Sequence, residues 1–285
     1  MKRIVGCLLA ALWMSAAAAY DPLNRQEYLA KIKEAEAYYD NKCATVAGEK
    51  IYKTVPEVEG VLLMKIRPLA TDREYSDPNW PGAAFAREAS GEGYIMYFLG
   101  YEHSSSRNGE RVTPQRRGYI NPEHNTNYVS NLPGYRWVDV VDEKDGKRYR
   151  YTLVTKIVGQ LDTTAQNVRI MLAENPNMDL NIYRTILDRQ PAPEPAPRYG
   201  VNFEDHVIPA ERAMWVASST VKVLDLKTDE VLGEMKRYAM SYVHVASSHN
   251  TGPWLTEDWC PADSVGAGAA TRKFVDQVLI PVKEH

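Results

Sequence analysis

The clearest pattern of apolar and polar positions lies in Met214–Val245, where it predicts two long strands joined by a tight polar turn at Lys227–Glu230. These strands are rich in β-branched and aromatic side chains, which suit a pleated, half-buried surface. In the first strand the apolar residues of one face are Trp215, Ala217, Val221 and Val223, with Thr220 and Lys222 on the other. Because successive side chains of a strand point to opposite faces, this pattern predicts that one face meets a core.

Further strands are predicted upstream. Tyr135–Val158 is typical of a second hairpin, because its Asp145-Gly146 turn stands between two runs rich in β-branched and aromatic residues. Gly60–Pro68 and Gly93–Glu102 are densely apolar and predict strands buried on both faces. The pattern of Leu180–Leu187 is ambiguous.

Three helices are predicted. Asp21–Lys42 has helical apolar spacing, an aspartate suited to the N-cap and a proline at the first helical position. Thr163–Asn175 and Thr271–Ile280 predict shorter helices, the second with its apolar residues on one face. The expected fold class is therefore α+β, a mostly antiparallel β-sheet with flanking N- and C-terminal helices.

Two segments lack regular periodicity. His103–Pro133 is long, polar and rich in Ser, Arg, Asn and Pro. In Gln190–Pro197 proline alternates with other residues, which predicts an extended segment that is either a domain linker or a surface crossing. We expect residues 20–285 to form a single α+β domain around this segment.

The N-terminus predicts a secretory signal peptide over residues 1–19. Lys2 and Arg3 precede an apolar run over Ile4–Trp13, and Ala17–Ala19 offers a small-residue cleavage site. This run is shorter than the roughly 20 residues that span a bilayer. A retained membrane anchor is the alternative. Cleavage predicts an exported, periplasmic protein of a Gram-negative bacterium with no membrane span.

The charge of the mature chain bears on its partners. Cleavage removes Lys2 and Arg3 and no acidic residue, so the formal net charge changes from −3 to −5. A mildly acidic protein lacks the basic field that general nucleic-acid binding requires, so we expect no nucleic-acid partner.

Two cysteines, Cys43 and Cys260, follow the predicted signal peptide. In an oxidising compartment an even pair predicts a disulfide, which would connect the N-terminal helix to the C-terminal segment. The alternatives are two buried free thiols or a reactive thiol. Neither cysteine lies in a C-x-x-C sequence.

No common catalytic motif is present, including the P-loop, G-x-S-x-G, G-x-G-x-x-G and H-E-x-x-H patterns. Ser219 and Lys222 match S-x-x-K, but in a strand positions i and i+3 face opposite sides, so we interpret the match as chance. The histidines lack the short spacings of zinc sites; they are His103, His124, His206, His244, His249 and His285. We expect no metal or cofactor.

Arginine and tryptophan, the residues that most often anchor protein interfaces, define a candidate interaction surface. It combines the polar segment with a later loop and comprises Arg107, Arg111, Arg116, Arg117, Tyr119, Trp254 and Trp259. A solvated loop without a partner is the alternative for the arginine-rich part.

The last third of the chain resembles exported proteobacterial proteins of uncharacterised function. The likeness comprises Asp225–Glu234, Pro253-Trp254, Trp259-Cys260-Pro261 and Thr271–Leu279. It implies a Gram-negative periplasm and a paired Cys260, and no catalytic residues.

From these patterns we expect a non-enzymatic periplasmic interaction protein, either an envelope assembly factor or an inhibitor or immunity-type protein, whose partner is another envelope or periplasmic protein. The alternative is a periplasmic hydrolase or small-ligand-binding protein, with His103, His124 or His244 as base.

Overall fold

The structure is a computed structural model that describes residues 25–104, 106–107, 110–111, 117–121, 130–132, 134–243, 252–261 and 269–282. Between residues 101 and 132 it describes the course of the backbone and not the side chains. The predicted signal peptide lies outside the described residues.

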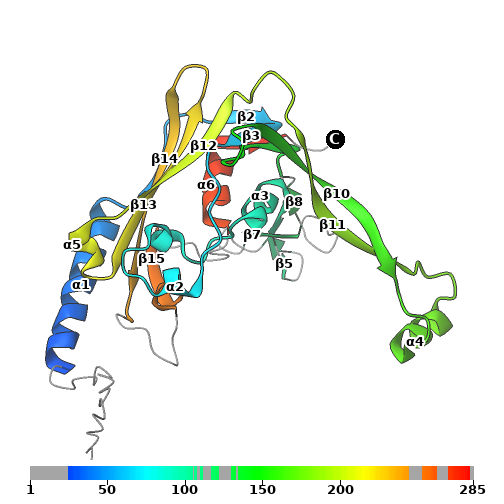
Figure 1. Ribbon diagram of the computed structural model, residues 1–285, viewed down its shortest axis with the longest axis horizontal. Coiled ribbons are helices and arrows are strands. Elements are labelled where there is room, and N and C mark those ends of the chain that lie inside the picture. Colours follow the sequence, from blue (N-terminus) through cyan, green and yellow to red (C-terminus); the bar gives the residue numbers. More distant parts are fainter. Residues whose placement is uncertain are drawn as a thin grey trace, which may run out of the picture.

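The chain alternates short helices with strands of very unequal length (Figure 1). The helices are α1 (Arg25–Thr45), α2 (Asp72–Tyr75), α3 (Glu92–Leu99), α4 (Gln166–Glu174), α5 (Pro209–Arg212) and α6 (Ala270–Val278), with 3-10 turns η2 (Pro81–Phe85) and η4 (Pro253–Thr256). The strands are β1 (Gly48–Ile51), β2 (Val55–Val58), β3 (Gly60–Leu63), β4 (Tyr101–Ser104), β5 (Ser106–Arg107), β6 (Glu110–Arg111), β7 (Arg117–Asn121), β8 (Ser130–Leu132), β9 (Trp137–Val141), β10 (Arg148–Gln160), β11 (Asn181–Pro191), β12 (Tyr199–His206), β13 (Val216–Asp225), β14 (Glu230–Ser241), β15 (Glu257–Cys260) and β16 (Leu279–Pro281).

One large sheet of nine strands dominates, in the order β1-β14-β13-β12-β3-β9-β10-β11, with β15 also pairing with β14. Its pairs are antiparallel except on the two sides of β3, which runs parallel to β12 and β9. The predicted mostly antiparallel sheet in a mixed α and β chain is therefore confirmed. Of the terminal helices, α1 contacts β14, and α6 contacts β1, β13 and β14.

The β13–β14 hairpin is the predicted one. Val221 pairs with Met235 across it, and its turn places Asp229 at φ 57°, a left-handed conformation that Asp tolerates better than most residues. All four predicted apolar residues of β13 and the residue before it are buried in the main core. The close approach of α6 requires Gly233, because a Cβ there would lie 2.7 Å from Val278.

The opposite face of this hairpin is also covered at one end. Val216, Tyr238 and Met240 form a second buried cluster with Ala35 and Tyr39 of α1. Burying such side chains contributes about 1.5 to 3 kcal/mol each. The hairpin therefore takes part in both packed layers, the main core on one face and the second cluster on the other.

The predicted disulfide is present between Cys43 and Cys260, with a Cα–Cα distance of 5.7 Å. It joins the end of α1 to the end of β15, beside the second cluster. No helix in the described part of the chain is long and apolar enough to span a bilayer.

The predicted strand Gly93–Glu102 is wrong. Most of it forms α3, in which Tyr94, Ile95, Phe98 and Leu99 are buried. These residues recur at helical spacing and share one helix face, but a short continuous apolar run does not distinguish a buried helix from a buried strand.

The second predicted hairpin is correct at its turn and too short at its end. Gly146 lies in the turn with φ 67°, and β9 pairs with the first residues of β10. However, β10 extends to Gln160 and pairs from Tyr149 onward with β11, which includes all of the ambiguous run except Leu180. The predicted helix between these strands is α4.

We expect removal of the disulfide to lower the free energy of unfolding by about 2 to 5 kcal/mol, because the bond closes a loop across a sequence separation of 217 residues. Urea denaturation of Cys43→Ser/Cys260→Ser, with the reduced wild-type protein as control, measures the change. Unchanged midpoints would contradict a stabilising role.

Candidate functional site

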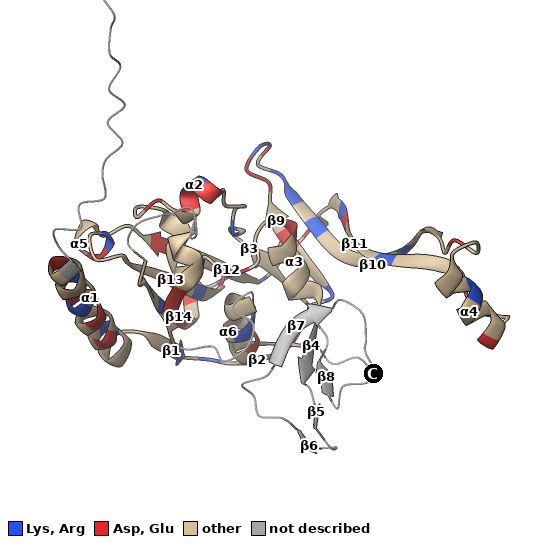
Figure 2. Ribbon diagram, turned by 90° about the horizontal axis from the view of Figure 1, so that it is seen from below, with Lys and Arg blue, Asp and Glu red and all other residues tan. Residues whose placement is uncertain are grey.

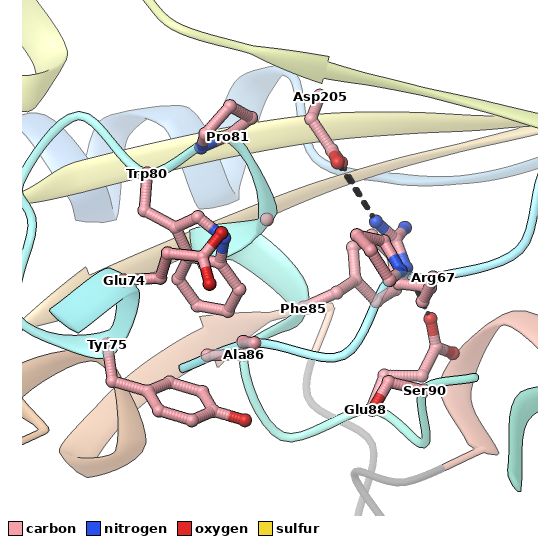
Figure 3. Close-up of a pocket in the computed structure, with 13 residues that line it drawn as sticks. Arg67, Glu74, Tyr75, Trp80, Pro81, Phe85, Ala86, Glu88, Ser90 and Asp205 are labelled. Atoms are coloured by element: carbon pink, nitrogen blue, oxygen red, sulfur yellow. Dashed lines mark hydrogen bonds and ion pairs between the residues drawn. The ribbon is translucent and has the colours of Figure 1, made fainter. Parts of the chain in front are cut away.

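A buried arginine packs against aromatic side chains of the main core. Arg67 follows β3, and its guanidinium is sandwiched between the rings of Phe85 and Phe203, 3.9 and 4.0 Å from their centroids. Its Nε donates to Glu88 at 2.7 Å and its Nη1 donates to Asp205 at 2.9 Å (Figure 3). Aromatic faces and carboxylates both stabilise a desolvated guanidinium.

The two carboxylates extend this network to other elements. Glu88 accepts hydrogen bonds from the backbone nitrogen and the hydroxyl of Thr271 in the first turn of α6, at 2.7 and 2.9 Å. A negative charge at a helix N-terminus is favourable. Asp205 accepts from the hydroxyl of Ser219 at 2.6 Å. The network therefore connects β12, β13, α6 and the segments that follow β3 and η2.

A cavity of about 140 Å³ opens beside this network. Its polar lining includes Arg67, Glu74, Glu88 and Asp205; Pro68, Ala70, Tyr75, Trp80, Pro81, Gly82, Phe85, Ala86 and Ser90 complete it. Its size is comparable with an apolar cavity of about 150 Å³ that accommodates benzene. The cavity therefore has room for a small group.

The lining of the cavity favours particular ligands. In Figure 3, Tyr75 and Trp80 lie on the side opposite Arg67, and their rings meet edge to face at 5.1 Å. Three carboxylates outnumber one guanidinium, which disfavours an anion. Arg67 Nη2 is buried without a hydrogen-bond partner among the described residues. Neutral or cationic small molecules fit best.

The predicted interaction surface is not brought together by the described side chains. Trp254 is fully buried, and its Nε1 donates to the Asp77 carbonyl at 2.8 Å, so it is a core residue and not a surface anchor. Trp259 is partly buried, with Arg87 and Arg237 over its ring. The side chains of Arg107, Arg111, Arg116, Arg117 and Tyr119 lie outside the described part.

A buried carboxyl group lies between these tryptophans in the sequence. Glu257 is 4% exposed, and neither of its carboxylate oxygens has a hydrogen-bond partner among the described residues. Burial raises the pKa of Glu257 well above its usual range, while the positive charges of Arg237, Arg87 and Arg212 oppose this shift. Glu257 is thus a buried acid that favours its protonated form.

The remaining candidate residues do not form a catalytic arrangement in the part that is described. Ser219 is fully buried against Asp205, whereas Lys222 is partly exposed and near Glu234, as expected for opposite faces of a strand. His206 shares a hydrogen bond with Thr220 at 2.9 Å. The other five histidine side chains lie outside the described residues, among which no metal-binding cluster occurs.

The most distinctive surface feature was not predicted from the sequence. Beyond residue 151, β10 pairs with β11 alone, and this ribbon carries α4 at its tip as an arm that projects from the body (Figure 1). Large apolar side chains are exposed along it; they are Ile157, Val158, Ile170, Met171, Ile182 and Tyr183. The ambiguous run Leu180–Leu187 was its sequence signal.

Comparison of the chain with protein-family models, curated proteins and solved structures finds no match in any of the three. The function must therefore be inferred from the geometry of the chain itself.

We expect Arg67→Met to lower the free energy of unfolding by about 3 to 5 kcal/mol, because it leaves two buried carboxylates uncompensated. Chemical denaturation measures the loss. The control Arg136→Met breaks an ion pair whose side chains are 53% and 57% exposed, and should cost at most about 1 kcal/mol. Equal effects of the two substitutions would contradict the role assigned to Arg67.

Glu257 should make stability depend on pH. Because its pKa is raised in the folded state, its contribution is present below the unfolded-state value of 4.5 and is lost as the pH rises through the folded value. Glu257→Gln should therefore gain stability relative to the wild type as the pH rises from about 4 to 8. Denaturation across this range, with exposed Glu143→Gln as control, measures the trend; an opposite slope would show an ionised Glu257.

Proposed function

We propose that this chain is an exported, non-enzymatic interaction protein of the Gram-negative envelope, either an assembly factor or an inhibitor or immunity-type protein. The observation that carries the proposal is the β10–β11 arm. It projects from the body and presents apolar side chains to solvent, with Ile157 58% and Ile170 55% exposed.

Physical chemistry makes such an arm an interaction element. An isolated two-stranded ribbon is marginally stable in water, and exposed apolar side chains along it gain no burial energy from folding. Figure 2 shows few charged residues on its outer part. Exposed apolar side chains that gather on one projecting element are typical of a surface that a partner covers.

The tip offers a second type of contact. In α4, Val168 is buried beneath the helix, while Ile170 and Met171 are exposed. Methionine adapts to irregular partner surfaces because its side chain is unbranched and polarisable. The arm thus combines a strand edge, which supplies main-chain hydrogen bonds, with an apolar helix at its end.

Export is supported by the disulfide and by the predicted signal peptide. Disulfides persist in oxidising compartments and are rare in the cytosol. The periplasmic assignment follows from the sequence patterns and from the resemblance to exported proteobacterial proteins.

A second candidate function is small-ligand binding in the cavity beside Arg67. The volume of the cavity and the Tyr75–Trp80 pair in its lining favour it. This site supports binding of a neutral or cationic ligand.

Replacing the outer arm, residues 157–183, by Asn-Gly should leave the body folded and abolish capture of a partner from envelope extracts, because the deleted residues make no contribution to the main core. Tagged mature protein, cross-linking and mass spectrometry measure capture. Ile170→Asp/Met171→Asp should reduce capture at least about tenfold.

The control is Leu69→Asp, which places one aspartate at an apolar residue 75% exposed on the body. Arg116→Glu/Arg117→Glu tests the arginine-rich segment in the same assay. If capture survives loss of the arm, the interaction proposal fails and the cavity becomes the leading site.

A further inference from the structure

Among the described strands, β11 ends the order of the large sheet, and only β10 pairs with it. It is 11 residues long, and six of those residues are exposed. Natural proteins avoid long, open apolar edges because unpaired N–H and C=O groups recruit another strand.

The arm also contains an unfavourable charge pair. Lys156 lies directly opposite Arg184 across the ribbon. Like charges at opposed positions destabilise a sheet. Four residues after Arg184, on the same face, β11 carries Asp188, which is near the body end of the strand.

We propose that β11 pairs antiparallel with β11 of a second copy of this chain, in a register centred on Ile186. The inference rests on the proposed role of the arm and names its partner. A twofold axis perpendicular to the sheet keeps every side chain on its own face, so opposed residues in such a pair have numbers of the same parity.

Charge complementarity selects the register. Centred on Ile186, the pairing places Arg184 opposite the partner's Asp188, twice by symmetry, and Tyr183 opposite the partner's Arg189. Centring on Thr185 or Leu187 instead places Arg184 opposite the partner's Ile186 or the partner's Gln190. Opposite charges stabilise opposed positions, so the first register is favoured.

The same register has two structural consequences. The partner's Asp188, which lies opposite Arg184, offsets the repulsion between Lys156 and Arg184. Pro191, which has no N–H to donate, falls at the end of the paired segment, where sheets tolerate proline. The tip of each arm then lies beside the base of the other, because Asn181 opposes the partner's Pro191.

Charge reversal tests the pairing. Wild-type mature protein should sediment at twice the mass of one chain, and Arg184→Asp or Asp188→Arg should each raise the dissociation constant at least about tenfold, because each opposes like charges twice. The combined variant Arg184→Asp/Asp188→Arg should restore the dimer. Lys222→Asp, on the β13–β14 hairpin, is the control and should change nothing.

Cross-linking tests the register. Opposed Cα atoms in an antiparallel pair are about 4.5 to 5.5 Å apart, within disulfide range. Ile186→Cys should therefore form an intermolecular disulfide under mild oxidation. Ile182→Cys is the control. Residue 182 opposes the partner's Gln190, which lies eight residues along the strand from the partner's own introduced cysteine, so the two cysteines are about 26 Å apart.

A monomeric wild type, or equal cross-linking of the two cysteine variants, would overturn the inference. A monomer that still loses partner capture when the arm is removed would leave the proposed function standing with a different partner. Failure of the charge-swapped variant to dimerise, in a folded protein, would overturn the register.

Discussion

The position of the Arg67 guanidinium is the constraint on which the arrangement of the body depends. A buried cation is tolerated because two aromatic rings and two carboxylates surround it, and these partners come from two segments, residues 85–88 and strand β12. Buried ion pairs contribute little net stability, since desolvation offsets the Coulombic gain. Their effect is conditional: without Glu88 and Asp205 the charge of the guanidinium is uncompensated, so packings that separate it from both carboxylates are disfavoured.

Local structure was largely predictable where pattern and turn chemistry agree. The β13–β14 hairpin has β-branched alternation and a polar turn, and its buried face matched. The cysteine pair followed from parity and compartment. By contrast, α3 was mistaken for a strand, because short apolar runs satisfy both periodicities.

The candidate sites were not predictable from the sequence. Arg67 lies 21 residues from Glu88 and 138 from Asp205, and no short motif records such distances. Trp254 is a residue type that often anchors interfaces, but its side chain is fully buried in the fold. The arm was not predicted because residue type does not show how far each strand is paired. Only the pairing shows that β10 continues beyond the end of its contact with β9.

The strands near the two ends of the chain pair with one another. β1 lies against β14, β2 runs parallel to β16, and α1 packs beside strands made some two hundred residues later. Contacts between residues so far apart in the sequence slow folding, because the entropy of loop closure is lost before these contacts can stabilise the chain. A chain that emerges N-terminus first therefore has no lasting partner for its first helix and strands until synthesis is nearly complete. Shortening the C-terminus would therefore leave the first helix and strands without their native contacts.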